Sequence, residues 1–389
     1  MKQENEKGGF PGGSDVLLIK AATKNGEEAV RCWQEWCSRH VLETDVTLDR
    51  YRVLPFVYEK MSRNPEAKNL SFPTGVEGAF KKTFFLNSLL FRHLIKTQAQ
   101  LEERGIPVVL LKGMAMIVSG MYPRPGSRFQ FDYDILVPFD QKEEAVSLFE
   151  RAGYKPYYEG GREYHLRTSH SAGFAVPDMP KYGSFDLHWA PLAAKKHRRT
   201  TDLFFREKKE TVFNGHRFFV PPPELLMVQT IVHGLRTDHT SHTQWVCDVM
   251  AILENCTGFD WEKLARYSEE LQTGFFIKKA VRFLREEIGA AIPPEAEAAV
   301  QNIRQSSAEP YLFSFYNSEK KGIADLFVWK LHESRQIQPE KPLPWHLLQI
   351  LGSWRNNRED LNTTAFLRLA ANRFGHLVKN SVPDYQGGK

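Results

Sequence analysis

The stretch from Gly105 to Pro138 reads GIPVVLLKGMAMIVSGMYPRPGSRFQFDYDILVP, and it decides the fold of this chain. Residues 106–111 form an apolar run of strand length, and residues 114–121 have helical spacing. Residues 131–137 alternate with a period of two, which predicts a second strand. The pattern therefore predicts a strand, a turn at Lys112-Gly113, a short helix and another strand.

The second predicted strand carries Asp132 and Asp134 on one face and its apolar side chains on the other. Two neighbouring carboxylates repel each other unless a cation lies between them, and a divalent metal ion is such a cation. Asp186 and His188 share one face of a later predicted strand. If the two strands are neighbours, three carboxylates meet. They could hold one or two Mg²⁺ ions for in-line phosphoryl or nucleotidyl transfer.

The order of these motifs resembles the DNA polymerase β-like nucleotidyltransferase superfamily. The motifs that carry the resemblance are GIPVVLLKG from Gly105, R-x-x-x-D-x-D-I-L-V from Arg128 and F-D-L-H-W from Phe185. Within that superfamily the chain is similar, over residues 15–260, to the bacterial family described as uncharacterised nucleotidyltransferases. The narrower match adds Arg52-Val-Leu-Pro55 upstream, and His233, Trp245 and Asp248 downstream.

The resemblance implies that the chain moves an NMP from an NTP, such as ATP, to an unidentified acceptor and releases pyrophosphate. It implies that Asp132, Asp134 and Asp186 are catalytic metal ligands, with Mg²⁺ or Mn²⁺ as cofactor. The acceptor stays open between a small molecule, a peptide and RNA. The roles of His233, Trp245 and Asp248 also stay open.

Four residues are predicted to bind the nucleotide: Lys112, Gly113, Arg128 and His188. The wider superfamily has Gly-Ser or Gly-Gly where this chain has Lys112-Gly113. A lysine beside a helix N-terminus suits a triphosphate, and without ligand we expect an aspartate as its partner. Gly113 is expected to keep a Cβ away from the ligand. For Arg128 the alternative is an ion pair with Asp132 or Asp134; for His188 it is a structural or Asp186-supporting role.

Periodicity along the chain predicts an α+β protein with a small mixed β-sheet, an N-terminal helical layer and a C-terminal helical bundle. The expected regions are a disordered tail 1–14, helices in 15–104 with a break near Asn25-Gly26, the nucleotidyltransferase core 105–220, a helical domain 221–380 and a disordered tail 381–389. Within the core we expect a third strand opening at Gly153-Tyr154, a hairpin of 171–176 with 182–189, and another around Asn214-Gly215.

The amino-acid composition excludes few functional classes of protein. A net charge of +5 permits an anionic nucleotide or RNA without requiring either. The four cysteines show no metal-binding spacing and there is no apolar window of membrane length, so we expect a cytoplasmic protein with no membrane span.

Two rival functions remain. The first is a toxin-like nucleotidyltransferase acting on tRNA or protein, with the basic run Lys195–Arg199 contacting RNA. The alternative interpretation of this basic run is an ordinary solvated surface. The second is a catalytically silent nucleotide-binding module.

Overall fold

The computed structural model describes residues 9–70, 72–158, 161–176, 183–193, 195–236, 242–318, 322–337 and 341–356. By its internal contacts the chain forms two compact units, 1–318 and 319–389. The second unit contains helices α16 (Ile323–Ile337) and α17 (Leu343–Asn356). Everything below concerns the first unit. The finer predicted division at residues 14, 104, 220 and 380 stays a prediction.

The central sheet has four strands in the order β1-β2-β4-β3. Their bounds are β1 Val109–Leu111, β2 Asp132–Leu136, β3 Ser171–Ala175 and β4 Ser184–His188. β2 pairs antiparallel with β1 and parallel with β4, and β4 pairs antiparallel with β3. The sheet is therefore mixed, and the predicted α+β class is confirmed.

A separate two-stranded hairpin, β5 (Lys209–Phe213) and β6 (His216–Val220), turns at Asn214-Gly215 as predicted. Both turn residues have positive φ, +49° and +78°, which is the conformation an Asn-Gly hairpin turn uses.

The predicted third strand at Gly153-Tyr154 is wrong. Only one isolated bridge forms there, between Pro156 and Phe174. Proline lacks the N–H that a ladder needs, so the pairing with β3 does not extend. The chain then turns into helix α8 (Arg162–Thr168).

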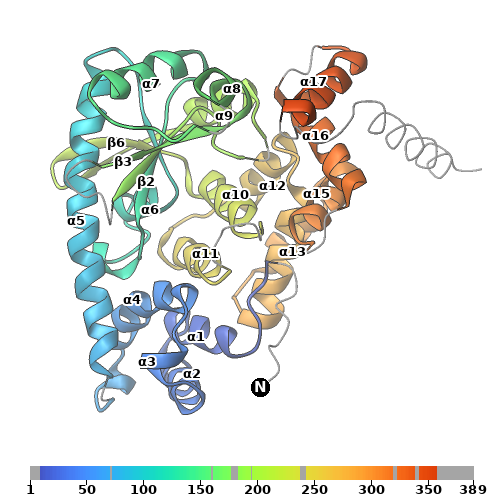
Figure 1. Ribbon diagram of the computed structural model, residues 1–389. Helices are drawn as coiled ribbons and strands as arrows, with labels where there is room; N and C mark the ends of the chain where they lie inside the picture. The colour runs from blue at the N-terminus through green and yellow to red at the C-terminus, as the bar shows by residue number, and fades with distance from the viewer. Residues whose placement is uncertain are drawn as a thin grey trace, which may run out of the picture. The chain divides into compact units, whose positions relative to one another are not determined.

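The apolar face of the sheet is covered by helices, foremost the long α5 (Thr74–Glu102), which runs along one side of the sheet in Figure 1. Tyr133 of β2 is fully buried there, and its hydroxyl lies 2.6 Å from Nδ1 of His93 on α5. Phe149 of α7 (Lys142–Arg151) packs against Phe185 of β4 with ring centroids 5.0 Å apart. These aromatic contacts fix which face of β2 and β4 remains for polar side chains.

The polar face of the sheet looks toward α10 (Pro223–Gly234) and α11 (Gln244–Asn255). Gln229 of α10 accepts a hydrogen bond from the backbone N–H of Lys112 at 3.4 Å and donates one to the carbonyl of Pro191 at 3.0 Å. Helix α10 is therefore tied to the turn after β1 and to the segment after β4.

The remaining helices complete the unit. Their bounds are α1 Gly13–Thr23, α2 Gly26–Arg39, α3 Leu42–Asp45, α4 Leu48–Ser62, α6 Lys112–Val118, α9 Arg198–Glu207, α12 Trp261–Glu270, α13 Gly274–Phe283, α14 Pro294–Gln301 and α15 Ala308–Tyr316. Short 3-10 turns cover Pro65–Ala67, Pro125–Ser127 and Phe139–Gln141, and a π-turn, Leu284–Ile288, continues α13. The break between α1 and α2 falls at Asn25-Gly26, as predicted.

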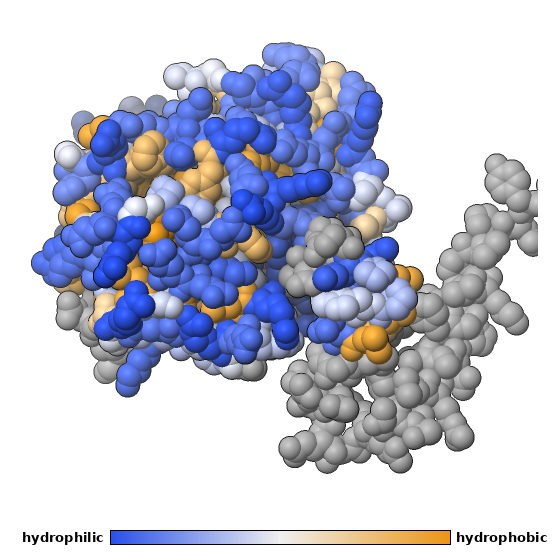
Figure 2. Space-filling view, turned by 90° about the horizontal axis from the view of Figure 1, so that it is seen from above, coloured by the Kyte–Doolittle hydropathy of each residue, from blue (hydrophilic) through white to orange (hydrophobic). Residues whose placement is uncertain are grey.

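On the face shown in Figure 2, hydrophobic side chains lie in small groups among hydrophilic ones. Within the described ranges, no helix combines the length and apolar character needed to cross a membrane. All four cysteines are free thiols.

The close packing of α10 on α11 generates the first prediction. A Cβ at Gly234 would collide with the Cβ and ring of Trp245, close to the α11 backbone. We expect Gly234→Ala to lower the free energy of unfolding by about 1–3 kcal/mol, because the helices must separate. Gly78→Ala is the matched control. Gly78 is an exposed residue of α5 with open space around it, so alanine there should stabilise the protein by about 0.5–1 kcal/mol. Urea unfolding of both variants decides, and equal effects would contradict the packing described.

Candidate metal and nucleotide site

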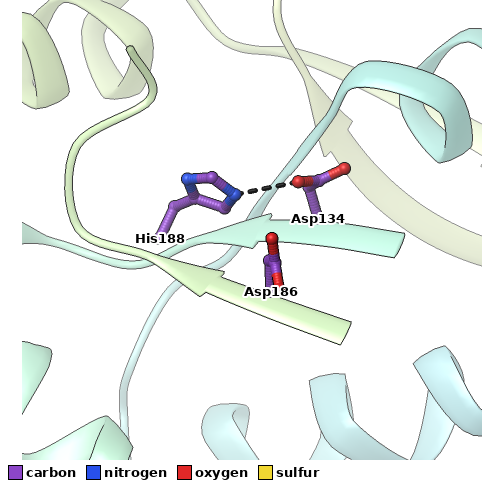
Figure 3. A group of neighbouring side chains, drawn as sticks. All are labelled: Asp134, Asp186 and His188. Carbon is purple, nitrogen blue, oxygen red and sulfur yellow. Dashed lines mark hydrogen bonds and ion pairs between the residues drawn. The ribbon is translucent and has the colours of Figure 1, made fainter. Parts of the chain in front are cut away.

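The register of β2 and β4 brings the acidic residues together. Because the two strands are parallel, Asp134 lies opposite Asp186 and Leu136 lies opposite His188. One ligand atom each from Asp134, Asp186 and His188 lies within 4.8 Å of the others (Figure 3). The expectation that Asp186 lies on a strand next to Asp132 and Asp134 is confirmed.

Asp134 is the most heavily engaged of these carboxylates. Its Oδ1 accepts hydrogen bonds from Nζ of Lys112 at 2.6 Å and from Nε2 of His188 at 2.8 Å. Burial alone would raise the pKa of Asp134, but the Lys112 ammonium and the His188 ring bring it well below its usual range. Its second oxygen, Oδ2, bonds to no described residue and is available to a metal ion. His188 thus supports Asp134 and not, as the sequence suggested, Asp186.

Asp132 and Asp186 have the opposite electrostatic character. Burial, together with the charges of Asp134 and Asp186, raises the pKa of Asp132 to about 6. Burial and the Asp134 charge likewise raise the pKa of Asp186. Asp132 lies outside the group formed by Asp134, Asp186 and His188. Both raised pKa values mean that this face favours a bound cation.

Lys112 occupies a strained position at the turn after β1. Its φ is +45°, in the left-handed region that costs a non-glycine residue about 1–2 kcal/mol. Burial would lower the pKa of Lys112, but Asp134 and Asp186 raise it. The predicted aspartate partner of Lys112 is therefore confirmed. The strain is maintained where the backbone must turn sharply to aim the ammonium at Asp134.

Gly113 is needed for a different reason from the one predicted. A Cβ at this position would overlap with the guanidinium of Arg128 and the amide of Gln130, and not with open ligand space. The residue that needs unusual backbone freedom is Lys112, since Gly113 has no positive φ. Gly113 makes room for Arg128, and its contact with a nucleotide stays a prediction.

Arg128 has neither of its predicted ion-pair partners. It binds Asp248 of α11 with two parallel contacts, Nε to Oδ1 and Nη2 to Oδ2, each 2.8 Å long. Burial would lower the pKa of Arg128, but Asp248 raises it above its ordinary value. Asp248 also accepts from the Tyr122 hydroxyl at 2.5 Å and from Gln244 at 3.1 Å. The open question of Asp248 thus has a structural answer, because this residue holds Arg128.

A cavity of about 260 Å³ lies over these residues. Its walls include the seven groups that carry charge and several aromatic and polar side chains: Arg52, Lys112, Arg128, Asp132, Asp134, Asp186, Asp248, Phe129, Phe131, Thr230, His233, Gln244 and Trp245. His188 approaches it from behind Asp134 and is almost fully buried.

His233 lines the cavity and is accessible to solvent there. Trp245 is mainly a packing residue: its ring contacts Phe10 and Phe283, and its indole N–H donates to the carbonyl of Gly9 at 3.3 Å. Arg52 also lines the cavity, although the sequence predicted no role for it beyond the motif Arg52-Val-Leu-Pro55. Its signal was an arginine within the otherwise apolar stretch Arg52-Val-Leu-Pro55.

The two lysines that begin the basic run Lys195–Arg199 are engaged within the fold. Lys195 is buried, donates to Gln272 at 3.1 Å, and burial lowers its pKa to about 8. Lys196 donates to the carbonyl of Thr168, and Arg198 pairs with Asp140 at 2.7 Å. Arg198 and Arg199 are exposed, so RNA contact by this run stays a prediction.

The contrast between Asp132 and Asp134 generates the second prediction. In EDTA at pH 7–8, Asp132→Asn should raise the free energy of unfolding by about 1–3 kcal/mol, because the fold disfavours this charge. The gain should disappear as the pH falls from about 6 to below its ordinary pKa of 3.8, where folded and unfolded chains are both protonated. Asp134→Asn should instead cost about 3 kcal/mol or more, since it leaves Lys112 unpaired.

The charge of Asp134 stabilises the fold above its unfolded pKa, and this contribution is lost as the pH falls toward its depressed folded value. Urea unfolding across pH 2–8 follows the loss of the Asp132→Asn gain and the start of the loss of the Asp134 contribution. If the two variants shift stability in the same direction at neutral pH, the description of the site is wrong.

Comparison with known proteins places the chain in a family. No curated protein matches it. Two solved structures overlap part of it: the antibiotic-resistance factor ANT(2'')-Ia (14% identity, 50% of this chain and 96% of that one, TM-score 0.33) and an antigenic nucleotidyltransferase-like protein from Paracoccidioides brasiliensis (13%, 57% and 95%, 0.35). Both overlaps are too loose to carry a conclusion. The model of the uncharacterised nucleotidyltransferase family, however, matches residues 46–288, more than half of the 389 residues, and the chain belongs to that family.

Proposed function

We propose that the protein transfers an NMP from an NTP to an acceptor and releases pyrophosphate, with a divalent metal ion held by Asp134, Asp186 and Asp132. The observation that carries the proposal is the meeting of acidic side chains from two parallel neighbouring strands in a cavity. Membership of a nucleotidyltransferase family supports the reaction class. A polymerase β-like mechanism is part of the proposal.

The residues present fit a hard divalent cation. Oδ2 of Asp134 is available, and Asp132 and Asp186 carry charges that the surrounding protein disfavours without a cation. Nε2 of His188 faces Oδ1 of Asp134, so the donor set is made of carboxylate oxygens. Oxygen donors favour Mg²⁺ or Mn²⁺. When bound, such an ion supplies charge neutralisation for the phosphates and lowers the pKa of an acceptor hydroxyl.

The chain's own residues have separate tasks in this proposal. Lys112 neutralises Asp134 before substrate enters and then donates to a β- or γ-phosphate oxygen. His188 orients the Asp134 carboxylate by donating to its Oδ1. Arg128, held by Asp248 and packed against Gly113, keeps the turn in place. Asp132 completes the carboxylate set that would hold the ion, and its charge is disfavoured by burial until a cation is bound.

The third prediction tests catalysis. Asp186→Asn should abolish pyrophosphate release from an NTP, ATP first, in the presence of Mg²⁺ and cell extract as acceptor source. Loss of a ligand should weaken metal binding by more than the roughly 10- to 100-fold typical of an outer partner. Asp202→Asn, which removes an exposed carboxylate on α9, is the control and should leave release unchanged.

The outcomes separate the alternatives. NTP binding by the parent protein without any pyrophosphate release would contradict transfer and favour a nucleotide-binding module. Unchanged release by Asp186→Asn would show that the metal is held elsewhere.

The fourth prediction concerns Lys112. Lys112→Ala should weaken Mg²⁺-dependent NTP binding by about 1.5–3 kcal/mol, the scale of one charge-assisted hydrogen bond. Lys112→Arg should recover only part of this, because a planar fork does not replace a point charge at 2.6 Å from Asp134. Isothermal titration of both variants measures the effect. NTP affinity equal to the parent's in Lys112→Ala would restrict the lysine to pairing with Asp134.

A further inference from the structure

Arg52 stands apart from the other cations of the cavity. It projects from α4, is half-buried and lines the cavity wall. Among the described residues, it forms no ion pair and no hydrogen bond, and its Nε is buried without a hydrogen-bond partner. Its guanidinium lies over the ring of Phe131, 5.9 Å from the ring centroid. The side chain is thus held in place by an aromatic ring and not by a carboxylate.

The neighbouring cations are already neutralised. Lys112 lies 2.6 Å from Asp134, and Arg128 makes two 2.8 Å contacts with Asp248. Each therefore has to give up or share a carboxylate before it can hold an anionic ligand. Arg52 has no such partner among the residues that the structure describes, so of the arginine and lysine side chains lining the cavity its charge is the one directly available to a ligand.

An unsatisfied guanidinium in a partly buried wall is unfavourable unless an anion completes it. Burial lowers the pKa of Arg52, and so does the nearby charge of Arg128, while Asp49 and Asp132 oppose this from a distance. Such a cost is understandable at a position where a ligand supplies the missing partner. The planar fork of arginine matches two oxygens of a phosphate group.

The position of Arg52 indicates which anion this is. Phe131, whose ring lies under the Arg52 guanidinium, directly precedes Asp132, the first residue of β2. Arg52 therefore lies beside the carboxylates proposed to hold the metal, where metal-bound phosphates would be. We infer that Arg52 is the principal anion-binding side chain of the cavity and binds a phosphate group of the nucleotide's triphosphate, an inference that rests on the proposed function.

The test is isothermal titration of the full chain, in Mg²⁺, with three probes: ATP, inorganic tripolyphosphate and adenosine. Arg52→Gln should weaken both ATP and tripolyphosphate by about 10- to 100-fold, the effect of one charged hydrogen-bonding group, and leave adenosine unchanged. Arg52→Lys should recover part of the loss. Arg92→Gln, which removes an exposed cation on α5 away from the cavity, is the charge-matched control and should bind like the parent.

Thermal unfolding without ligand separates a binding role from a structural one. Arg52→Gln removes a cation without a carboxylate partner, so it should melt at or above the parent's temperature. If Arg52→Gln melts well below the parent instead, Arg52 also serves the fold. Arg52→Lys then tests binding, because it keeps the charge but loses the planar fork, and it should bind the phosphate probes more weakly than the parent.

The remaining outcomes have distinct meanings. A parent protein that binds no ATP overturns the proposed function itself. If the parent binds ATP and Arg52→Gln binds both phosphate probes equally well, the inference is overturned while the proposed function stands. Loss of ATP with full retention of tripolyphosphate would place Arg52 at the base and overturn the phosphate assignment. Unchanged ATP binding with reduced pyrophosphate release would assign the anion to the acceptor and overturn it too.

Discussion

One carboxylate oxygen ties the site together. Oδ1 of Asp134 accepts from Lys112 at 2.6 Å and from His188 at 2.8 Å, and these donors come from the turn after β1 and from the end of β4. The central strand β2 is thereby joined through its side chain to both of its neighbours, in addition to the ladder hydrogen bonds. Asp134 is buried and the Lys112 side chain is only 19% exposed, so removing either member of this ion pair leaves a poorly compensated charge. The pair thereby holds the turn in its strained conformation.

A second buried pair performs the same task across the cavity. The Arg128–Asp248 ion pair joins the segment that precedes β2 to α11. Because Gly113 has no side chain, the Arg128 guanidinium has room beside it. Charges that sequence motifs suggested as ligand-binding are thus partly used to build the walls. What remains for a ligand is the acidic face at Asp132 and Asp186, which favours a cation, and the guanidinium of Arg52, which favours an anion. A metal–phosphate complex would satisfy both.

The local sequence pattern predicted secondary structure correctly wherever the residue types allow few backbone conformations. The period-two alternation of 131–137 predicted β2, Asn214-Gly215 predicted the β5–β6 turn, and the glycine after Asn25 marked the helix break. The prediction was wrong at Gly153-Tyr154, where a common helix-to-strand connection suggested a strand. Pro156 limits that pairing to one bridge, because a ladder depends on a donor that proline does not have.

The sequence by itself determined the mixed α+β fold, the shared strand face of Asp132 and Asp134, and the family to which the chain belongs, because strand periodicity and motif order are local properties. Only the tertiary structure decided the partners of each charge. Asp134 pairs with Lys112, 22 positions away, and Arg128 pairs with Asp248, 120 positions away. Among the described residues, Arg52 has no carboxylate partner at all. Such pairings depend on strand register and helix packing, which bring distant charges within reach, and no spacing along the chain records them.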